Sequence, residues 1–245
     1  TYIHESSIVN QVEAHNEVSA YKATPKNSSQ GQRFYYMDSM IKKLASIDNN
    51  FSFGKAATMV AVMTLFARLS GFVLKLFLTK TFGAGQELDI YLTAFRIPDT
   101  LYNLLILGTL SAAFVPVFNE YWHKDKLKAY SLANTILNIS VVTMGIAAII
   151  LWLFTKPLTQ LLVPGFSESQ LNQTVLLTRI MLISPIIFTV SNVFTSILTA
   201  QKRFFIINIA PLLYNLGIMF GLLFLYPIIG MTGLAIGVIV GALLH

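Results

Sequence analysis

Long apolar stretches follow one another from residue 56 almost to the end of the chain, separated by short polar connections. A helix needs about 20 predominantly apolar residues to cross the hydrocarbon core of a bilayer, and it satisfies its backbone hydrogen bonds internally. The sequence therefore predicts an all-α polytopic membrane protein with six transmembrane helices. The predicted spans are residues 56–78, 90–117, 132–154, 175–200, 205–226 and 229–244.

The composition supports the same class. Only 11% of the residues are charged, whereas an ordinary soluble domain carries about 25%, which argues against a water-soluble globular enzyme. The absence of cysteine excludes disulfides, thiolate metal sites and cysteine nucleophiles. The histidines lack metal-ligand spacing. We therefore expect no metal ion, no cofactor and no catalytic residues, and nothing indicates nucleic acid as a partner.

The first 53 residues differ from the rest of the chain. They are rich in polar side chains and contain no long apolar run, so we predict a largely disordered extension over residues 1–53. Within it, residues 34–47 have the pattern of an interfacial helix on an anionic leaflet, and a connecting helix without a lipid role is an equal alternative. Residues 54–245 would form the six-span lobe. Both ends of the sequence are typical of a fragment.

The basic residues of the connections predict the orientation. Lysines precede the first span and lie between the second and third, and Lys202 and Arg203 lie between the fourth and fifth. The other connections are poor in basic residues. Cytoplasmic loops are enriched in Lys and Arg. We therefore expect a multi-pass protein of the cytoplasmic membrane with a cytoplasmic N-terminus.

Two basic residues interrupt the first span. Arg68 lies near its middle, and Lys75 follows seven residues later at nearly the same helical angle, with Gly71 between them. An Arg at the bilayer centre costs about 2.5–3.5 kcal/mol on insertion scales, so this stripe should face protein or water, with Gly71 leaving room for a ligand or another backbone. In the structural alternative, Arg68 pairs with a carboxylate and Lys75 extends to the outer interface.

The second span carries a polar face of its own. Asp89, Arg96, Asp99 and Asn103 are spaced seven, three and four residues apart, which places them along one side of a helix. Arg96 could pair with Asp99, which would be a structural role. Pro98 frees backbone carbonyls at a depth where they are tolerated if they line a cavity. Two polar faces within the bilayer predict a wet, net-positive cavity that suits an anion such as phosphate.

Other patterns concern helix packing. Asn192, Asn208 and Asn215 can hydrogen-bond between helices, and Arg179 is predicted to anchor its helix at the interface rather than bind a ligand. Small residues four apart are typical of close helix contacts. The last two spans contain such residues at Gly217, Gly221, Gly233, Gly237 and Gly241.

Several short motifs of the apolar region carry a family resemblance. They are ARLSGF at 67–72, TFGAG at 81–85, AFRIP at 94–98, SAAFVP at 111–116, VPGF at 163–166, KRF at 202–204 and APLLYN at 210–215. In order and spacing they resemble the MurJ (MviN) lipid II flippases, which belong to the multidrug, oligosaccharidyl-lipid and polysaccharide exporter superfamily. The resemblance begins at about residue 56 and does not cover the polar extension.

The resemblance implies a transporter, not an enzyme, with two pseudo-symmetric six-helix lobes that open alternately to the two sides of the membrane. Its cargo would be lipid II, the undecaprenyl-pyrophosphate-linked precursor of peptidoglycan, used for cell-wall synthesis. The six spans fit the N-terminal lobe, so the missing C-terminal lobe and membrane lipids are implied partners. By position, Arg68 matches a basic cavity residue thought to contact the pyrophosphate, and Asp89 and Arg96 match an acidic and a basic position of the second span.

The chain departs from the family pattern where Leu74, Tyr102 and Asn103 stand at positions that are usually basic. Fewer cations should hold a pyrophosphate less tightly, which leaves two alternatives open. One is a polysaccharide or drug exporter of the same superfamily, and the other is a non-transporting membrane scaffold derived from a flippase lobe. The predicted substrate-binding residues are Arg68, Lys75 and Arg96, with Asp89, Asp99 and Asn103 as supporting polar groups.

Overall fold

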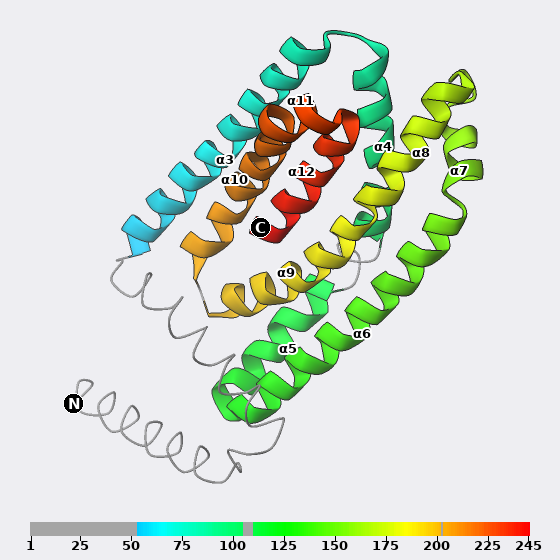
Figure 1. Ribbon diagram of the computed structural model, residues 1–245. Helices are drawn as coiled ribbons and strands as arrows, with labels where there is room; N and C mark the ends of the chain where they lie inside the picture. Colours follow the sequence, from blue (N-terminus) through cyan, green and yellow to red (C-terminus); the bar gives the residue numbers. More distant parts are fainter. Residues whose placement is uncertain (1–52, 105–109, 202) are drawn as a thin grey trace, which may run out of the picture. The chain divides into compact units, whose positions relative to one another are not determined.

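The computed structural model describes residues 53–104, 110–201 and 203–245. Every regular element within these ranges is a helix, which confirms the all-α prediction (Figure 1). Residues 34–47, predicted as an interfacial helix, lie outside the described ranges, as does almost all of the predicted polar extension.

The helices follow one another with short connections. α8 and α9 are separated only at Leu182, and a π-helical segment, η2, continues α10 into α11. The elements are α3 (Phe53–Phe82), α4 (Gln86–Tyr102), α5 (Leu110–Lys124), α6 (Lys126–Leu153), α7 (Thr155–Leu162), α8 (Glu168–Met181), α9 (Ile183–Ala200), α10 (Phe204–Phe220), η2 (Gly221–Leu225), α11 (Tyr226–Ile229) and α12 (Met231–Leu244).

Four helical stretches of the described chain are long and apolar enough to cross a bilayer. They correspond to the first, third, fourth and fifth predicted spans, and they make this an all-α polytopic membrane protein. The fourth begins earlier than predicted because the polar first turns of α8 continue directly into its apolar part. The stretches are Thr58–Phe82, Lys126–Leu153, Glu168–Ala200 and Phe205–Ile229.

The other two predicted spans leave the six-span count a prediction. α12 has 14 residues, fewer than the about 20 that a crossing takes. The span predicted at residues 90–117 corresponds to α4 and α5, between which residues 105–109 are not described. Within the described ranges, neither α4 nor α5 alone is long enough to cross.

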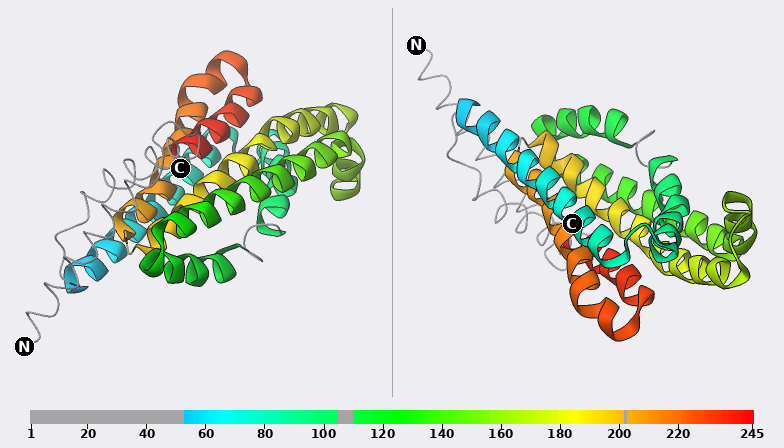
Figure 2. Two further views of the ribbon diagram at one scale, coloured as in Figure 1. Left: turned by 90° about the horizontal axis from the view of Figure 1, so that it is seen from below. Right: turned by 90° about the horizontal axis from the view of Figure 1, so that it is seen from above.

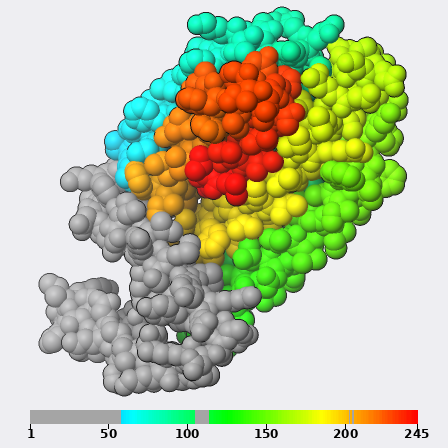
Figure 3. All heavy atoms as spheres, viewed as in Figure 1, coloured from blue at the N-terminus to red at the C-terminus, as the bar shows by residue number. Residues whose placement is uncertain are grey.

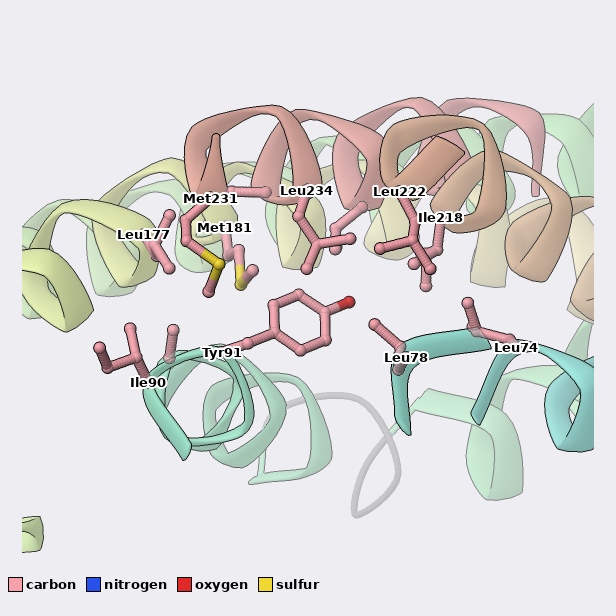
Figure 4. Packing of buried hydrophobic residues seen from close by; sticks show 13 residues of the cluster. Leu74, Leu78, Ile90, Tyr91, Leu177, Met181, Ile218, Leu222, Met231 and Leu234 are labelled. Atoms are coloured by element: carbon pink, nitrogen blue, oxygen red, sulfur yellow. The ribbon is translucent and has the colours of Figure 1, made fainter. Parts of the chain in front are cut away.

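One hydrophobic core joins α3, α4, α8, α10, η2 and α12. Figure 4 shows Leu78 of α3 and Tyr91 of α4 on one side of this core, with Met181 of α8 and Leu234 of α12 on the other. Tyr91 is 2% exposed and Leu234 is 0% exposed. Because α3 and α4 rest on the same core, their inner faces are fixed and their outer faces are left free of lobe contacts.

Glycines bring the last two apolar segments into backbone contact. A Cβ added to Gly217 would lie 2.3 Å from the Cα of Gly241, and one added to Gly237 would lie 2.6 Å from the Cα of Gly221. Only hydrogen side chains allow such a close approach. The expected small-residue packing is therefore confirmed, and Figure 3 shows α12 lying directly against α10 on the face in view.

The turn between α3 and α4 is tight and fastened to α11. Gly83 follows the last turn of α3 with a φ of +61°, a left-handed conformation that favours glycine. The Tyr226 hydroxyl donates a hydrogen bond to Glu87 Oε2 at 3.0 Å, and its ring meets that of Phe82 edge to face. The turn and these contacts set where the two charge-bearing helices begin to diverge.

Candidate functional site

The predicted polar face of α4 is present and points out of the lobe. Asp89, Arg96, Asp99 and Asn103 are all exposed. The opposite side of the helix is packed, with seven buried residues that contact the core and the neighbouring helices. They are Ile90, Tyr91, Thr93, Ala94, Ile97, Pro98 and Leu101. The helix is therefore amphipathic in a membrane region, with its charges turned away from the lobe's own core.

The two cations of α3 are exposed. Leu74 and Leu78 are buried at 7% exposure each, whereas Arg68 and Lys75 are exposed. At 100° per residue, the two cations lie on the border between the packed side of α3 and its exposed apolar side. They therefore form a continuous stripe that no other part of the described lobe covers.

The ion pairs of the structural alternative do not form. Within the described ranges, Arg68, Lys75, Arg96 and Asp99 make no ion pair and no side-chain hydrogen bond with one another or with other residues. Exposed pairs do occur elsewhere, for example Lys124 with Glu120 at 2.7 Å. Arg68, Lys75 and Arg96 are thus not used in ion pairs or side-chain hydrogen bonds with the described part of the lobe.

The stripe on α3 is held in place by asparagines of α10, which runs along α3 in Figures 1 and 2. Asn215 Nδ2 donates to Ser70 Oγ at 2.8 Å and to the Ala67 carbonyl at 3.3 Å. The Thr64 hydroxyl donates to Asn208 Oδ1 at 3.1 Å. The prediction that these asparagines bond between helices is confirmed.

Gly71 was predicted to leave room for a ligand or for another backbone, and the structure places a neighbouring helix there. A Cβ at this position would lie 3.4 Å from Asn215 Nδ2, so the glycine faces α10. Asn192 differs from Asn208 and Asn215, because its Nδ2 is buried and has no hydrogen-bond partner among the residues that the structure describes. Sequence spacing showed which residues share a helix side, but it did not show which neighbour that side meets.

The carbonyl freed by Pro98 does not line a cavity. Pro98 has no N–H to donate to the Ala94 carbonyl, one helical turn earlier, and the hydroxyl of Thr178 on α8 donates to that oxygen at 3.3 Å. Thr178 and Ala94 are both 0% exposed. The sequence pattern did not single out Thr178. The position of Ala94 four residues before a proline indicates that its carbonyl lacks a helical donor, but it does not identify the donor, which comes from a residue far along the chain.

Two of the three residues that stand where the resemblance implies a basic side chain make apolar contacts within the lobe. Leu74 belongs to the core, and the half-buried ring of Tyr102 lies 5.5 Å from that of Phe188 on α9. The third, Asn103, is exposed. Arg179 is also used for packing: its guanidinium lies 4.6 Å from the ring of Trp152, and its Nε donates to the Trp152 carbonyl at 3.4 Å.

The chemistry that this arrangement can perform is the binding of an anion. α3 carries Arg68 and Lys75 on one side and contains no acidic residue, whereas α4 carries Arg96 together with the acidic Glu87, Asp89 and Asp99. A cation in a membrane region is costly unless it meets water, an opposite charge or a ligand. Among the described residues, no group of three or more His, Asp or Glu side chains is placed to hold a metal ion.

Comparison with known proteins gives one consistent family. A family model described as Lipid II flippase MurJ matches residues 78–245. The match includes Asp89, Arg96, Asp99 and Asn103, and it begins after Arg68 and Lys75.

Curated proteins with related sequences carry the same description. A probable lipid II flippase MurJ of Borreliella burgdorferi is 28% identical over 187 residues, which cover 76% of this chain and 37% of that protein. One of Buchnera aphidicola subsp. Acyrthosiphon pisum is 29% identical over 164 residues, 66% of this chain and 32% of that protein. The lipid II flippase MurJ of Burkholderia cenocepacia is 28% identical over 200 residues, which cover 78% of this chain and 38% of that protein.

The chain thus spans less than two fifths of the length of each of these relatives. The family model nevertheless covers well over half of the chain, and it includes the polar face of α4 and the glycine contacts of α12. On this match, the chain belongs to the MurJ lipid II flippase family.

Proposed function

We propose that this chain is the N-terminal lobe of a flippase that moves lipid II across the cytoplasmic membrane by alternating access, for peptidoglycan synthesis. The observation that carries the proposal is the set of exposed cations on α3 and α4 that have no partner in the described part of the chain, in a chain of the MurJ family. The proposal includes a polar extension over residues 1–53, a six-span lobe over residues 54–245, and a cytoplasmic N-terminus.

In this proposal Arg68, Lys75 and Arg96 bind the pyrophosphate of the cargo. A guanidinium presents paired donors to phosphate oxygens, and an ammonium acts as a point charge. Both attract an anion more strongly in a region of low dielectric than in bulk water. The prenyl tail would stay in the lipid while the headgroup crosses through the cavity, and the C-terminal lobe would form the opposite wall.

Asp89, Asp99 and Asn103 are proposed as supporting groups on the same face of α4. Asp89 lies seven residues before Arg96, about 10 Å along the helix at 1.5 Å per residue. Asp99 lies within one turn of Arg96, where a negative charge offsets part of the positive potential. A partly offset site would release the headgroup after it crosses, because a transporter must bind its cargo only transiently.

Replacement of Arg68 tests this function in the full-length protein. Arg68→Ala should abolish rescue of a flippase-depleted strain and weaken lipid II binding by about tenfold or more, because a charge-assisted hydrogen bond contributes about 1.5–3 kcal/mol. Arg68→Lys keeps the charge and should retain part of the rescue. Leu69→Ala changes a neighbouring exposed apolar residue and is the control. Normal rescue by Arg68→Ala at an equal membrane level would refute the role.

A further inference from the structure

We propose that Thr178 is a positioning residue for the charged face of α4. Its hydroxyl supplies the hydrogen bond that Pro98 removes from the helix, and it thereby fixes the direction that α4 takes past Pro98. The functional part of this inference rests on the proposed flippase function. The structural part stands on the contact between α4 and α8 alone.

The geometry of the contact is that of a replaced backbone bond. In a regular helix, the N–H of residue 98 would donate to the carbonyl of residue 94, but proline has no N–H. The Thr178 hydroxyl takes this place, with Oγ1 3.3 Å from the Ala94 oxygen. All three residues are buried, so water does not compete for the carbonyl.

Thr178 uses its hydroxyl differently from other buried threonines of the lobe. Such side chains usually donate to the carbonyl four residues earlier in their own helix. Four of them follow this rule, whereas Thr178 donates to another helix, to a residue 84 positions away. The four are Thr155, Thr159, Thr174 and Thr189.

A second proline in the lobe also has a hydroxyl bonded to the carbonyl that it frees. Pro185 leaves the Met181 carbonyl without its helical donor, and the Ser184 hydroxyl donates to that oxygen at 2.7 Å. Ser184 lies next to Pro185 in the same helix, so this bond is local. The bond from Thr178 instead links α4, one turn before its proline, to a separate helix.

Pro98 lies within the predicted binding face. It follows Arg96 by two residues and directly precedes Asp99. The direction of the helix past Pro98 therefore decides how Asp99 and Asn103 are placed relative to Arg96 and to the cations of α3. Without the donor from α8, the part of α4 that follows Pro98 is free to change its direction, and a buried carbonyl is left unsatisfied.

The direction of α4 past Pro98 can be measured by the distance between two spin labels. Leu104 lies just past the end of α4 and is 73% exposed, and Leu176 on α8 is 50% exposed, so Leu104→Cys and Leu176→Cys provide the two label sites. Both labels are placed in the full-length protein with any other cysteines removed. Thr178→Val should shift or broaden the distance distribution by electron–electron resonance, and Thr178→Ser should restore it. Thr174→Val, a buried threonine of the same helix that bonds within it, is the matched control.

The proline gives a second and independent test. Pro98→Ala restores the N–H, so Thr178→Val should have no added effect in that background, on the distances or on the membrane level. The inference is overturned if Thr178→Val leaves the distances unchanged, or if its effect persists undiminished with Pro98→Ala. If Thr178→Val alone does not reach the membrane, recovery in the Pro98→Ala background supports the inference and failure there contradicts it.

Function is read out separately. Thr178→Val should reduce rescue of the flippase-depleted strain at an equal membrane level, and Thr178→Ser should not. Unchanged rescue with altered distances would overturn the positioning role. If instead Arg68→Ala rescues normally, the proposed function fails while the hydrogen bond to Ala94 remains measurable, so the two failures are distinguishable.

Discussion

At the scale of single residues, the surroundings of each charge decide what it does. The guanidinium of Arg179 packs on the ring of Trp152. Glu120 forms an exposed pair, and the hydrogen bond from Lys124 and the charge of Lys124 lower the pKa of its carboxyl, so the pairing is lost as the pH falls through that lowered value. Arg68 and Arg96 do neither, since they are exposed and unpaired within the described ranges. That difference separates candidate ligands from structural charges.

Lys75 and Lys80 offer a matched comparison on one helix. Both are exposed on α3, but Lys75 lies on the stripe with Arg68, and Lys80 lies in the last turn. Lys75→Gln should weaken lipid II binding by several-fold and lower rescue of a flippase-depleted strain, because it removes a charge from the binding face. Lys80→Gln should leave both unchanged. Equal effects of the two substitutions would mean that only the total charge matters.

At the scale of helices, the charged faces are set by contacts on the opposite sides. α3 is oriented by Asn215 and Asn208 of α10, and α4 is oriented by its buried face and by Thr178 of α8. In a bilayer, such polar hydrogen bonds and close small-residue contacts supply much of the stabilisation between helices that hydrophobic burial supplies in water. The other helices of the lobe therefore fix the rotation of α3 and α4 about their own axes.

Glycine contacts test how rigid this arrangement is. Gly237→Ala places a methyl group 2.6 Å from the Cα of Gly221, so the backbones must separate, and overpacking of this kind costs about 1–3 kcal/mol. We expect a lower melting temperature of the purified protein in detergent. Gly145→Ala is the control, because nothing lies within 4 Å of its added Cβ and alanine is the better helix former. An equal loss for both variants would contradict the packing role.

At the scale of the whole molecule, the two charge-bearing helices lie at one side of the core and not within it. α8, α10 and α12 cover their inner sides, and the outer sides have no partner in the described lobe. A chain that spans less than two fifths of its relatives leaves room for a second lobe to face those sides. A binding site between two lobes is the arrangement that we propose for the cargo.

The orientation of the molecule can be tested with single cysteines, because the sequence has none of its own. In the full-length protein with any other cysteines removed, Lys128→Cys should react with a membrane-impermeant maleimide only after the cells are permeabilised. Gly165→Cys should react in intact cells. The reason is the positive-inside rule, which places the lysine-rich connection between α5 and α6 in the cytoplasm. The reverse labelling pattern would show that the orientation is wrong.

The sequence by itself determined the class of protein and the helix sides. Apolar stretches of membrane length and scarce charges allow little other than a bundle of transmembrane helices. Helical periodicity placed Arg68 with Lys75, and Asp89 with Arg96 and Asp99, on common sides, and the structure has these residues exposed. The glycine contacts were also predictable, because only the smallest residue permits helices to touch by their backbones.

Only the tertiary structure decided what each side meets. Periodicity gives the angle of a residue around its own helix, but the identity of the neighbouring helix depends on contacts between distant parts of the chain. For this reason Gly71 faces Asn215 and not a ligand space, and the carbonyl freed by Pro98 is bonded to Thr178 and not open to a cavity. The same long-range packing left Arg68, Lys75 and Arg96 without partners among the described residues, which no spacing rule could foresee.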